Sequence, residues 1–316
     1  MTSSRTRDLD GRLIVVIGGT GFFGVHLAQH LLDRGARLRL ASRHPARAFR
    51  IKPLAALGQV QAVAADVTRP ETVAAALAGA DAVVNLVGAF AGDLDAVQGA
   101  GAGRIAALAR AAGAQTFVHV SAIGADAGSP VAYARTKAAG EAAVLAAWPD
   151  AVVLRPSILF GADDRFIHLF AGLMAMPVLP VFAPEARLQP LDIDDAAQAV
   201  ANVLAAPAAF AGKTYELGGP EVVSVIELNR RIARATGRAP WLVPLPDGLA
   251  AFIAALPLTP ISRDQYALLR QGNVASGDYP GIRDLGVTPR PLDALLDHGL
   301  VTYRKNGRFG VRPARK

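Results

Sequence analysis

Residues 16–24, VIGGTGFFG, decide the fold of this chain. The apolar run RLIVVIG that leads into them is typical of a buried strand, and a helix is predicted over residues 22–34. Gly18 allows a tight turn, Gly21 lets the backbone approach a pyrophosphate, and Gly24 lets the helix lie close to the sheet. The free N–H groups at the helix start favour an anion. This strand, turn and helix therefore predict a dinucleotide-binding unit.

Short apolar runs and Ala- and Leu-rich segments alternate after this turn. Further strands are predicted at residues 36–42, 60–66, 80–88, 114–122, 150–157 and 215–219. Helices are predicted at 68–79, with Thr68 as the cap, near 94–112 and around Tyr133. Such alternation predicts an α/β fold, a Rossmann-like doubly wound parallel sheet. Residues 1–160 form the predicted nucleotide-binding domain, with 189–218 returning to it. Residues 161–188 and 219–316 form a smaller, mainly helical substrate or partner region.

Composition limits the possible functions. The 316 residues include no cysteine, which excludes disulfides, thiolate metal sites and a cysteine nucleophile. The net charge of +7 is concentrated at the end of the chain, in Arg304, Lys305, Arg308, Arg312, Arg315 and Lys316. We expect no nucleic-acid binding. The basic tail is either solvated or in contact with anionic lipid or an acidic partner such as a respiratory complex.

The location of the protein is predicted from its apolar stretches. The first dozen residues lack the apolar core of a signal peptide, and prolines interrupt the most apolar later segments. We expect a soluble cytoplasmic protein, with the tail as the candidate for peripheral contact with the inner face of the membrane.

The end of the second predicted strand indicates which dinucleotide binds. An acidic residue there would bind the ribose hydroxyls of NAD(H), but the chain has Ser42 and Arg43, with Arg47 a turn later. A guanidinium suits a 2′-phosphate, so NADP(H) is favoured over NAD(H). Arginine is the default cation of this lysine-poor chain, which leaves a purely structural role open.

Other cofactor contacts are predicted at the ends of neighbouring strands. Asp66 either binds the adenine or caps the next helix, and Gly88 admits the cofactor ribose. The predicted set also includes Thr20, Phe22, Phe23, Val67, Leu86 and Val87, and Tyr133 and Lys137 from a later helix.

Tyr133 and Lys137 are the predicted catalytic pair. They lie four residues apart, on one face of a helix. A nearby ammonium would lower the phenol pKa from its usual value of about 10, so that the tyrosine exchanges a proton near neutrality. Ser121, at the carboxyl edge of the fifth strand, would orient a substrate carbonyl or alcohol.

These residues together resemble a known superfamily. The glycine turn, Ser121 and Tyr133-x-x-x-Lys137 look like the short-chain dehydrogenases/reductases, in their extended or atypical branches. The later stretches LQPLDIDDAAQAV, GKTYELGGPEVVS, ISRDQ and DLGVTP resemble the atypical group that contains the NADPH-binding accessory subunit of respiratory complex I. The resemblance implies that Pro156 and Ser157 pass the nicotinamide end of the cofactor.

Three functions remain open at this point. The first is an oxidoreductase that moves a hydride between NADP(H) and a carbonyl or alcohol of an apolar, quinone-like or other small molecule. The second, implied by the resemblance to the complex I subunit, is a cofactor-bound structural or assembly factor without turnover. The third is a nucleotide-sugar epimerase or dehydratase. No metal site is predicted, because the histidines are isolated and the acids at 192–195 precede a helix. The oligomeric state is open.

Overall fold

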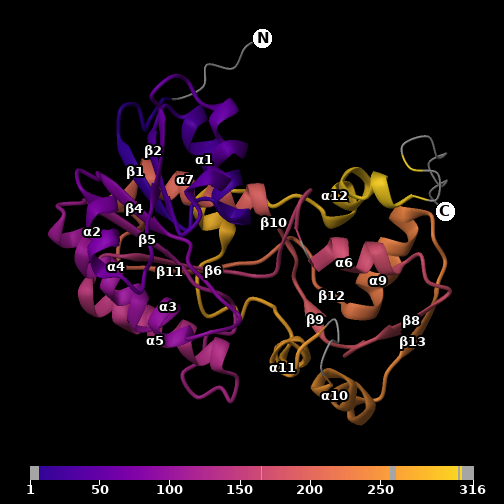
Figure 1. Cartoon of the computed structure of the whole chain (residues 1–316). Coiled ribbons are helices and arrows are strands. Elements are labelled where there is room, and N and C mark those ends of the chain that lie inside the picture. Colours follow the sequence, from indigo (N-terminus) through magenta and orange to yellow (C-terminus); the bar gives the residue numbers. More distant parts are fainter. Residues whose placement is uncertain (1–6, 165, 257–260, 305–306, 308–316) are drawn as a thin grey trace. The chain divides into compact units, whose positions relative to one another are not determined.

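The computed structural model describes residues 7–164, 166–256, 261–304 and 307 (Figure 1). The chain divides into two compact units. The first unit comprises Met1–Pro156, Asp194–Glu216 and Gly277–Val287, and the second comprises Ser157–Ile193, Leu217–Ser276 and Thr288–Lys316. The basic tail, apart from Arg304, lies outside the described residues, so its predicted contact with lipid or a partner stays a prediction.

A seven-stranded sheet forms the centre of the first unit, in the order β11-β6-β5-β4-β1-β2-β3. The strands are β1 (Leu13–Ile17), β2 (Arg37–Ser42), β3 (Val60–Ala64), β4 (Ala82–Asn85), β5 (Thr116–Val120), β6 (Val152–Pro156) and β11 (Thr214–Leu217). Neighbouring strands run parallel. The order reverses between β1 and β4, where dinucleotide-binding sheets bind their ligand. The predicted Rossmann-like fold is confirmed.

Helices cover both faces of this sheet (Figure 1). The helices α1 (Phe22–Asp33) and α7 (Ile193–Ala205) lie on one side, where Nη1 of Arg34 donates to the Ala201 carbonyl over 2.8 Å. The other side carries α2 (Pro70–Leu77), α3 (Leu94–Gln98), α4 (Ala100–Ala111) and α5 (Ala132–Ala147). Apolar side chains of the sheet, such as Val15, Val83 and Phe117, pack into one buried core with those of α2, α4 and α5.

Two local features differ from the sequence-based expectation. The single helix predicted near 94–112 is broken at Gly99, because the Asp95 carboxylate lies where a Cβ would be and accepts the Ala100 N–H. Thr68 does not cap α2. Its hydroxyl donates to the Asp66 carboxylate over 2.7 Å, and Arg69 is the residue at the cap.

The second unit consists of three two-stranded ribbons and a group of helices. The ribbons pair β7 (Leu159–Phe160) with β10 (Leu191–Asp192), β8 (Val178–Val181) with β13 (Trp241–Pro244), and β9 (Arg187–Leu188) with β12 (Val223–Ser224). The helices are α6 (Phe166–Leu173), α9 (Val225–Thr236), α10 (Asp247–Ala255), α11 (Arg263–Gln271) and α12 (Leu292–Gly299). Phe160 and Met174 are buried in the core of this unit, and Phe166 and Phe170 pack against it. These side chains serve as core.

Residues 277–287 were assigned to the C-terminal region from the sequence, but they pack with the first unit. The N–H of Glu216, in β11, donates to the Pro280 carbonyl over 3.0 Å. A bridge between Glu216 and Gly281 continues this contact.

Within the described ranges, every helix is too short or too polar to cross a bilayer. The same ranges hold no group of three or more His, Asp or Glu side chains with the geometry of a metal site.

Candidate cofactor and catalytic site

The glycine turn leaves β1 at the carboxyl edge of the sheet. Gly18 has φ +81°, a conformation that only glycine adopts readily, and its N–H donates to the Ala41 carbonyl at the end of β2. A Cβ on Gly24 would lie 2.3 Å from the Gly19 carbonyl oxygen. Gly24 therefore allows α1 to approach the turn itself. The start of α1, at Gly21, has no side-chain cap and no acidic residue, so its first N–H groups suit an anion.

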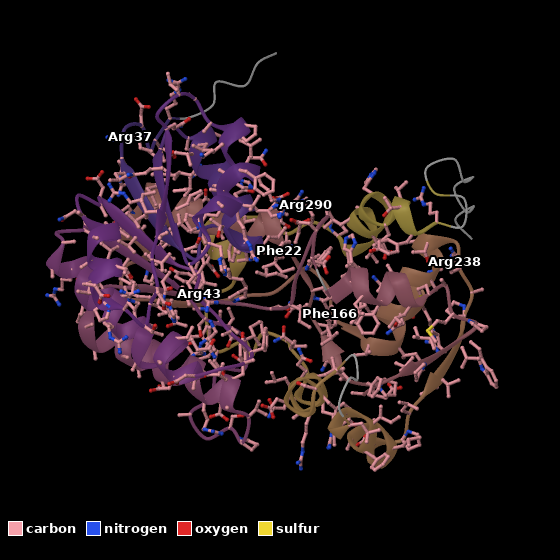
Figure 2. The ribbon with its side chains drawn as sticks, viewed as in Figure 1. Phe22, Arg37, Arg43, Phe166, Arg238 and Arg290 are labelled. Carbon is pink, nitrogen blue, oxygen red and sulfur yellow. The ribbon has the colours of Figure 1, made fainter. Side chains whose placement is uncertain are left out.

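The end of β2 is tied to this turn. Thr20 donates a hydrogen bond to the Ser42 hydroxyl over 2.9 Å. Arg43, the next residue, is exposed. Figure 2 labels Arg43 and Phe22, which begins α1, among the side chains of this unit. The predicted residues of these two segments are thus brought together, with a cation and no acidic side chain at the end of β2.

Asp66 follows β3, and its carboxylate is hydrogen-bonded within its own turn. Its carboxylate accepts hydrogen bonds from the Thr68 N–H and hydroxyl, which lower the Asp66 pKa, and the charge of Arg43 lowers it further. The carboxylate stabilises the turn before α2. The neighbouring Val67 is buried, and its carbonyl accepts a hydrogen bond from Arg104.

The end of β4 reaches the predicted catalytic lysine. The Leu86 N–H donates to the Ile17 carbonyl, and the Val87 N–H to the Asn85 side chain. A Cβ added to Gly88 would lie 3.4 Å from Nζ of Lys137. Gly88 therefore leaves space between β4 and the lysine.

Ser121 and Lys137 meet at the end of β5. Nζ of Lys137, on α5, donates to the carbonyl of Val120 over 3.2 Å. Ser121 directly follows Val120, and its buried hydroxyl has no hydrogen-bond partner within the described part of the chain. A buried hydroxyl without a partner is costly, and a polar atom of a ligand would satisfy it.

Tyr133 begins the same helix one turn before Lys137. Its ring stacks on that of Phe90, and Nζ of Lys137 lies 6.0 Å from its centroid. Burial raises the pKa of Tyr133 to about 12. The expectation that Lys137 lowers this pKa is wrong for this structure, because desolvation outweighs a cation that is directed at the Val120 carbonyl.

A buried ionic network lies behind Lys137. Burial lowers the Lys137 pKa to about 8, and the charge of Glu141, one turn further along α5, opposes this shift. Arg155, in β6, holds Glu141 with hydrogen bonds of 2.9 and 2.6 Å and approaches Glu216 at 3.6 Å. The Tyr279 ring covers the guanidinium, 4.6 Å away.

Sequence reasoning missed this network. The sequence leaves open whether Arg155 and Arg165 face a substrate anion or form structural pairs. Arg155 forms the structural pair, and Arg165 lies outside the described residues. The one available signal was the four-residue spacing between Lys137 and Glu141.

His119 is a second buried group that the sequence did not indicate. Its Nδ1 lies 3.2 Å from the Asn85 side-chain amide. Burial, assisted by the charge of Lys137, lowers its pKa to about 3. His119 therefore stays neutral beside the lysine.

Pro156 ends β6, and Ser157 follows it. The Pro156 carbonyl accepts the N–H of Ile123, two residues beyond Ser121. Ser157 belongs to the second unit, and its hydroxyl donates to the Gln189 carbonyl over 2.5 Å. Its role at the nicotinamide stays a prediction.

Comparison with known proteins gives consistent relatives. A family model described as NAD(P)H-binding matches residues 18–165. NADH dehydrogenase (ubiquinone) 1 alpha subcomplex subunit 9 of Rattus norvegicus is 30% identical, over 90% of this chain and 78% of that protein. The protein of the same name from Dictyostelium discoideum is 30% identical, over 97% and 88%. A ceramide reductase of Caulobacter vibrioides is 33% identical, over 75% of each chain.

Solved structures share the fold. The triphenylmethane reductase of Citrobacter sp. complexed with NADP(H) has a TM-score of 0.71 at 20% identity, over 90% of this chain and 99% of that one. The dTDP-glucose 4,6-dehydratase DesIV of Streptomyces venezuelae has a TM-score of 0.72 at 21% identity, over 93% and 97%.

Proposed function

The chain belongs to the family of the alpha subcomplex subunit 9 of NADH dehydrogenase (ubiquinone), among the extended short-chain dehydrogenases/reductases, and from this membership we propose that it is an NADP(H)-dependent reductase of a carbonyl on an apolar substrate. The single observation that carries the proposal is the set at the end of β5. There the Ser121 hydroxyl has no partner among the described residues. Ser121 follows Val120, whose carbonyl accepts a hydrogen bond from Lys137 Nζ, and Tyr133 lies one turn before Lys137 on α5.

A bound nicotinamide would supply the hydride. Tyr133, whose phenol is protonated at neutral pH, donates its proton to the substrate oxygen as the carbonyl becomes an alcohol. The Ser121 hydroxyl donates a hydrogen bond that orients that oxygen. The Lys137 ammonium binds the cofactor ribose and supports the negative charge that Tyr133 acquires when it gives up its proton.

The preference for NADP(H) rests on the end of β2. Arg43 is exposed there, beside Ser42, and no acidic residue is present to bind the ribose hydroxyls of NAD(H). A guanidinium pairs well with a 2′-phosphate. The apolar substrate is supported by the relative named ceramide reductase. We therefore propose a ketone on a long aliphatic chain as the substrate class.

The test measures NADPH oxidation by the purified protein with a series of long-chain ketones. Tyr133→Phe should lower turnover at least about 100-fold while the Kd for NADPH stays unchanged. Tyr215→Phe is the matched control, because Tyr215 is a buried tyrosine of β11 outside the site. Full turnover by Tyr133→Phe would refute the catalytic assignment.

A second candidate is a cofactor-bound subunit or assembly factor without turnover. It is favoured by relatives that align with up to 98% of this chain and are named as NADH dehydrogenase subunits. Denaturing the extensively washed protein and counting the released nucleotide separates the two. Near one NADP(H) per chain, without turnover of any ketone, favours the subunit. An empty site that binds NADPH reversibly favours the enzyme.

A further inference from the structure

The stretch that runs from the end of α1 through β2 and its connection to β3 is strongly basic. Residues 34–65 contain no acidic residue but carry Arg34, Arg37, Arg39, Arg43, Arg47, Arg50 and Lys52. The net charge of +7 does not reveal these cations, because acidic residues elsewhere in the chain offset their charge. Some of these cations are engaged inside the unit. For example, Arg34 approaches Asp8 at 3.8 Å, and Arg39 donates to the carbonyls of Ala76 and Ala78.

The part of this connection from Arg47 to Leu57, here called the 47–57 segment, has a distinct outer surface. It contains two short helical turns, η1 (Pro45–Arg50) and η2 (Lys52–Leu54). Ala48 and Ile51 are completely buried and fix the segment to the unit. The other side chains of the segment are exposed, apart from the half-buried Ala55.

Three of the exposed side chains are large and apolar. Phe49 is 67% exposed, Leu54 is 49% exposed, and Leu57 is fully exposed. They alternate along the chain with Arg47, Arg50 and Lys52, which are also exposed. Large apolar side chains that remain exposed together on a short segment mark an interaction surface.

We propose that the 47–57 segment docks on the surface of an anionic lipid bilayer. Phe49, Leu54 and Leu57 enter the boundary between headgroups and acyl chains, and the cations beside them pair with lipid phosphates. The mixture of apolar and basic side chains argues against nucleic acid as the partner. Nucleic acid would pair with the cations and stack on Phe49, but it has no apolar surface in which the two leucines would be buried. The proposal goes beyond the proposed reaction and does not depend on it.

The test is co-sedimentation of the full chain with vesicles of phosphatidylcholine mixed with phosphatidylglycerol, and with vesicles of phosphatidylcholine alone. We expect binding to the anionic vesicles that weakens with added salt. Phe49→Ser combined with Leu57→Ser should lower the affinity about tenfold or more. Arg50→Gln combined with Lys52→Gln should reduce both the affinity and its salt dependence.

The matched control is Trp241→Ser combined with Phe252→Ser, which removes apolar side chains of similar exposure, 73% and 64%, from the second unit. Deletion of residues 305–316 tests the basic tail separately. The control and the truncated protein should both bind like the unaltered chain. Thermal melting of each variant verifies the fold, and all substituted side chains are exposed, so melting temperatures should change little.

Several results would overturn the proposal. These are no binding to anionic vesicles by the unaltered chain, undiminished binding by Phe49→Ser with Leu57→Ser, and loss of binding on deletion of 305–316 alone. Binding to a DNA duplex that equals vesicle binding and ignores the two serine substitutions would assign the segment to nucleic acid instead.

Discussion

The ring of Phe90 lies parallel to the ring of Tyr133, with centroids 4.4 Å apart and 10° between the planes. Phe90 is itself 63% exposed, so it covers the tyrosine from the solvent side. Part of the desolvation that raises the Tyr133 pKa therefore comes from one side chain that can be removed without opening a core.

Phe90→Ala should lower the Tyr133 pKa from about 12 towards its usual value of 10, because water then reaches the phenol. Ultraviolet difference spectra across alkaline pH measure this pKa, with Tyr133→Phe used to assign the signal. An unchanged pKa would mean that the rest of the site, and not Phe90, keeps water from the phenol.

Lys137→Met should stabilise the protein at pH 7 by up to about 3 kcal/mol, the cost of lowering the lysine pKa from 10.5 to about 8. Between these values the unfolded chain binds more protons than the folded one, so the unaltered protein gains stability as pH rises from 8 to 10.5. The advantage of the methionine should shrink over the same window. Urea unfolding at pH 7 and pH 10 measures both effects, and an advantage independent of pH would contradict this account.

Glu141→Gln should lower the Lys137 pKa below about 8, because a carboxylate that favours the ammonium is removed. NMR of ¹³Cε-labelled lysine can follow this, since the chain holds only Lys52, Lys137, Lys213, Lys305 and Lys316. Glu216→Gln is the matched control, because Glu216 contacts the same Arg155 but lies on β11. An equal shift in both variants would mean that the total charge of the network matters, not the position of Glu141.

Gly24→Ala should impair both stability and NADPH binding, because the new Cβ would lie 2.3 Å from a backbone oxygen of the glycine turn. Gly248→Ala is the control. Gly248 is also helical, but a Cβ there meets nothing within 4 Å, so stability should rise by about 0.5–1 kcal/mol. Thermal melting and NADPH titration measure both. Normal NADPH affinity in Gly24→Ala would show that the turn shifts without cost to the cofactor.

Arg43→Gln should weaken NADPH binding about tenfold and leave NADH binding unchanged, because only NADPH carries the 2′-phosphate. Arg37→Gln, an exposed arginine at the other end of β2, should change neither (Figure 2). Isothermal titration with both nucleotides measures the difference. Equal losses for the two nucleotides would remove Arg43 from the phosphate site.

Local signals made much of the fold predictable from the sequence. Strands such as β1 and β5 are short apolar runs whose neighbours are helices and turns, and the glycine turn has a spacing set by its own geometry. The break at Gly99 was not predictable in this way, because it depends on the Asp95 carboxylate accepting a hydrogen bond from the Ala100 N–H. Helix-forming residues on both sides concealed it.

The sequence proposes residues for the site but does not predict their electrostatics. Ser121, Tyr133 and Lys137 are found by motif and spacing. The pKa values of Tyr133 and Lys137 depend on burial, and that of Lys137 also on the charge of Glu141. Spacing alone suggested a lowered Tyr133 pKa, whereas desolvation reverses the sign.

The return of residues 277–287 to the first unit has a consequence for synthesis. The chain passes between the units after residues 156, 193, 216, 276 and 287, so neither unit is one continuous stretch. While the ribosome still holds residues 277–287, β11 lacks the backbone partners that Pro280 and Gly281 provide. Until then the edge of the nascent sheet at β11 stays unpaired, and unpaired sheet edges promote aggregation. Residues up to 287 must emerge before the nucleotide-binding unit can close.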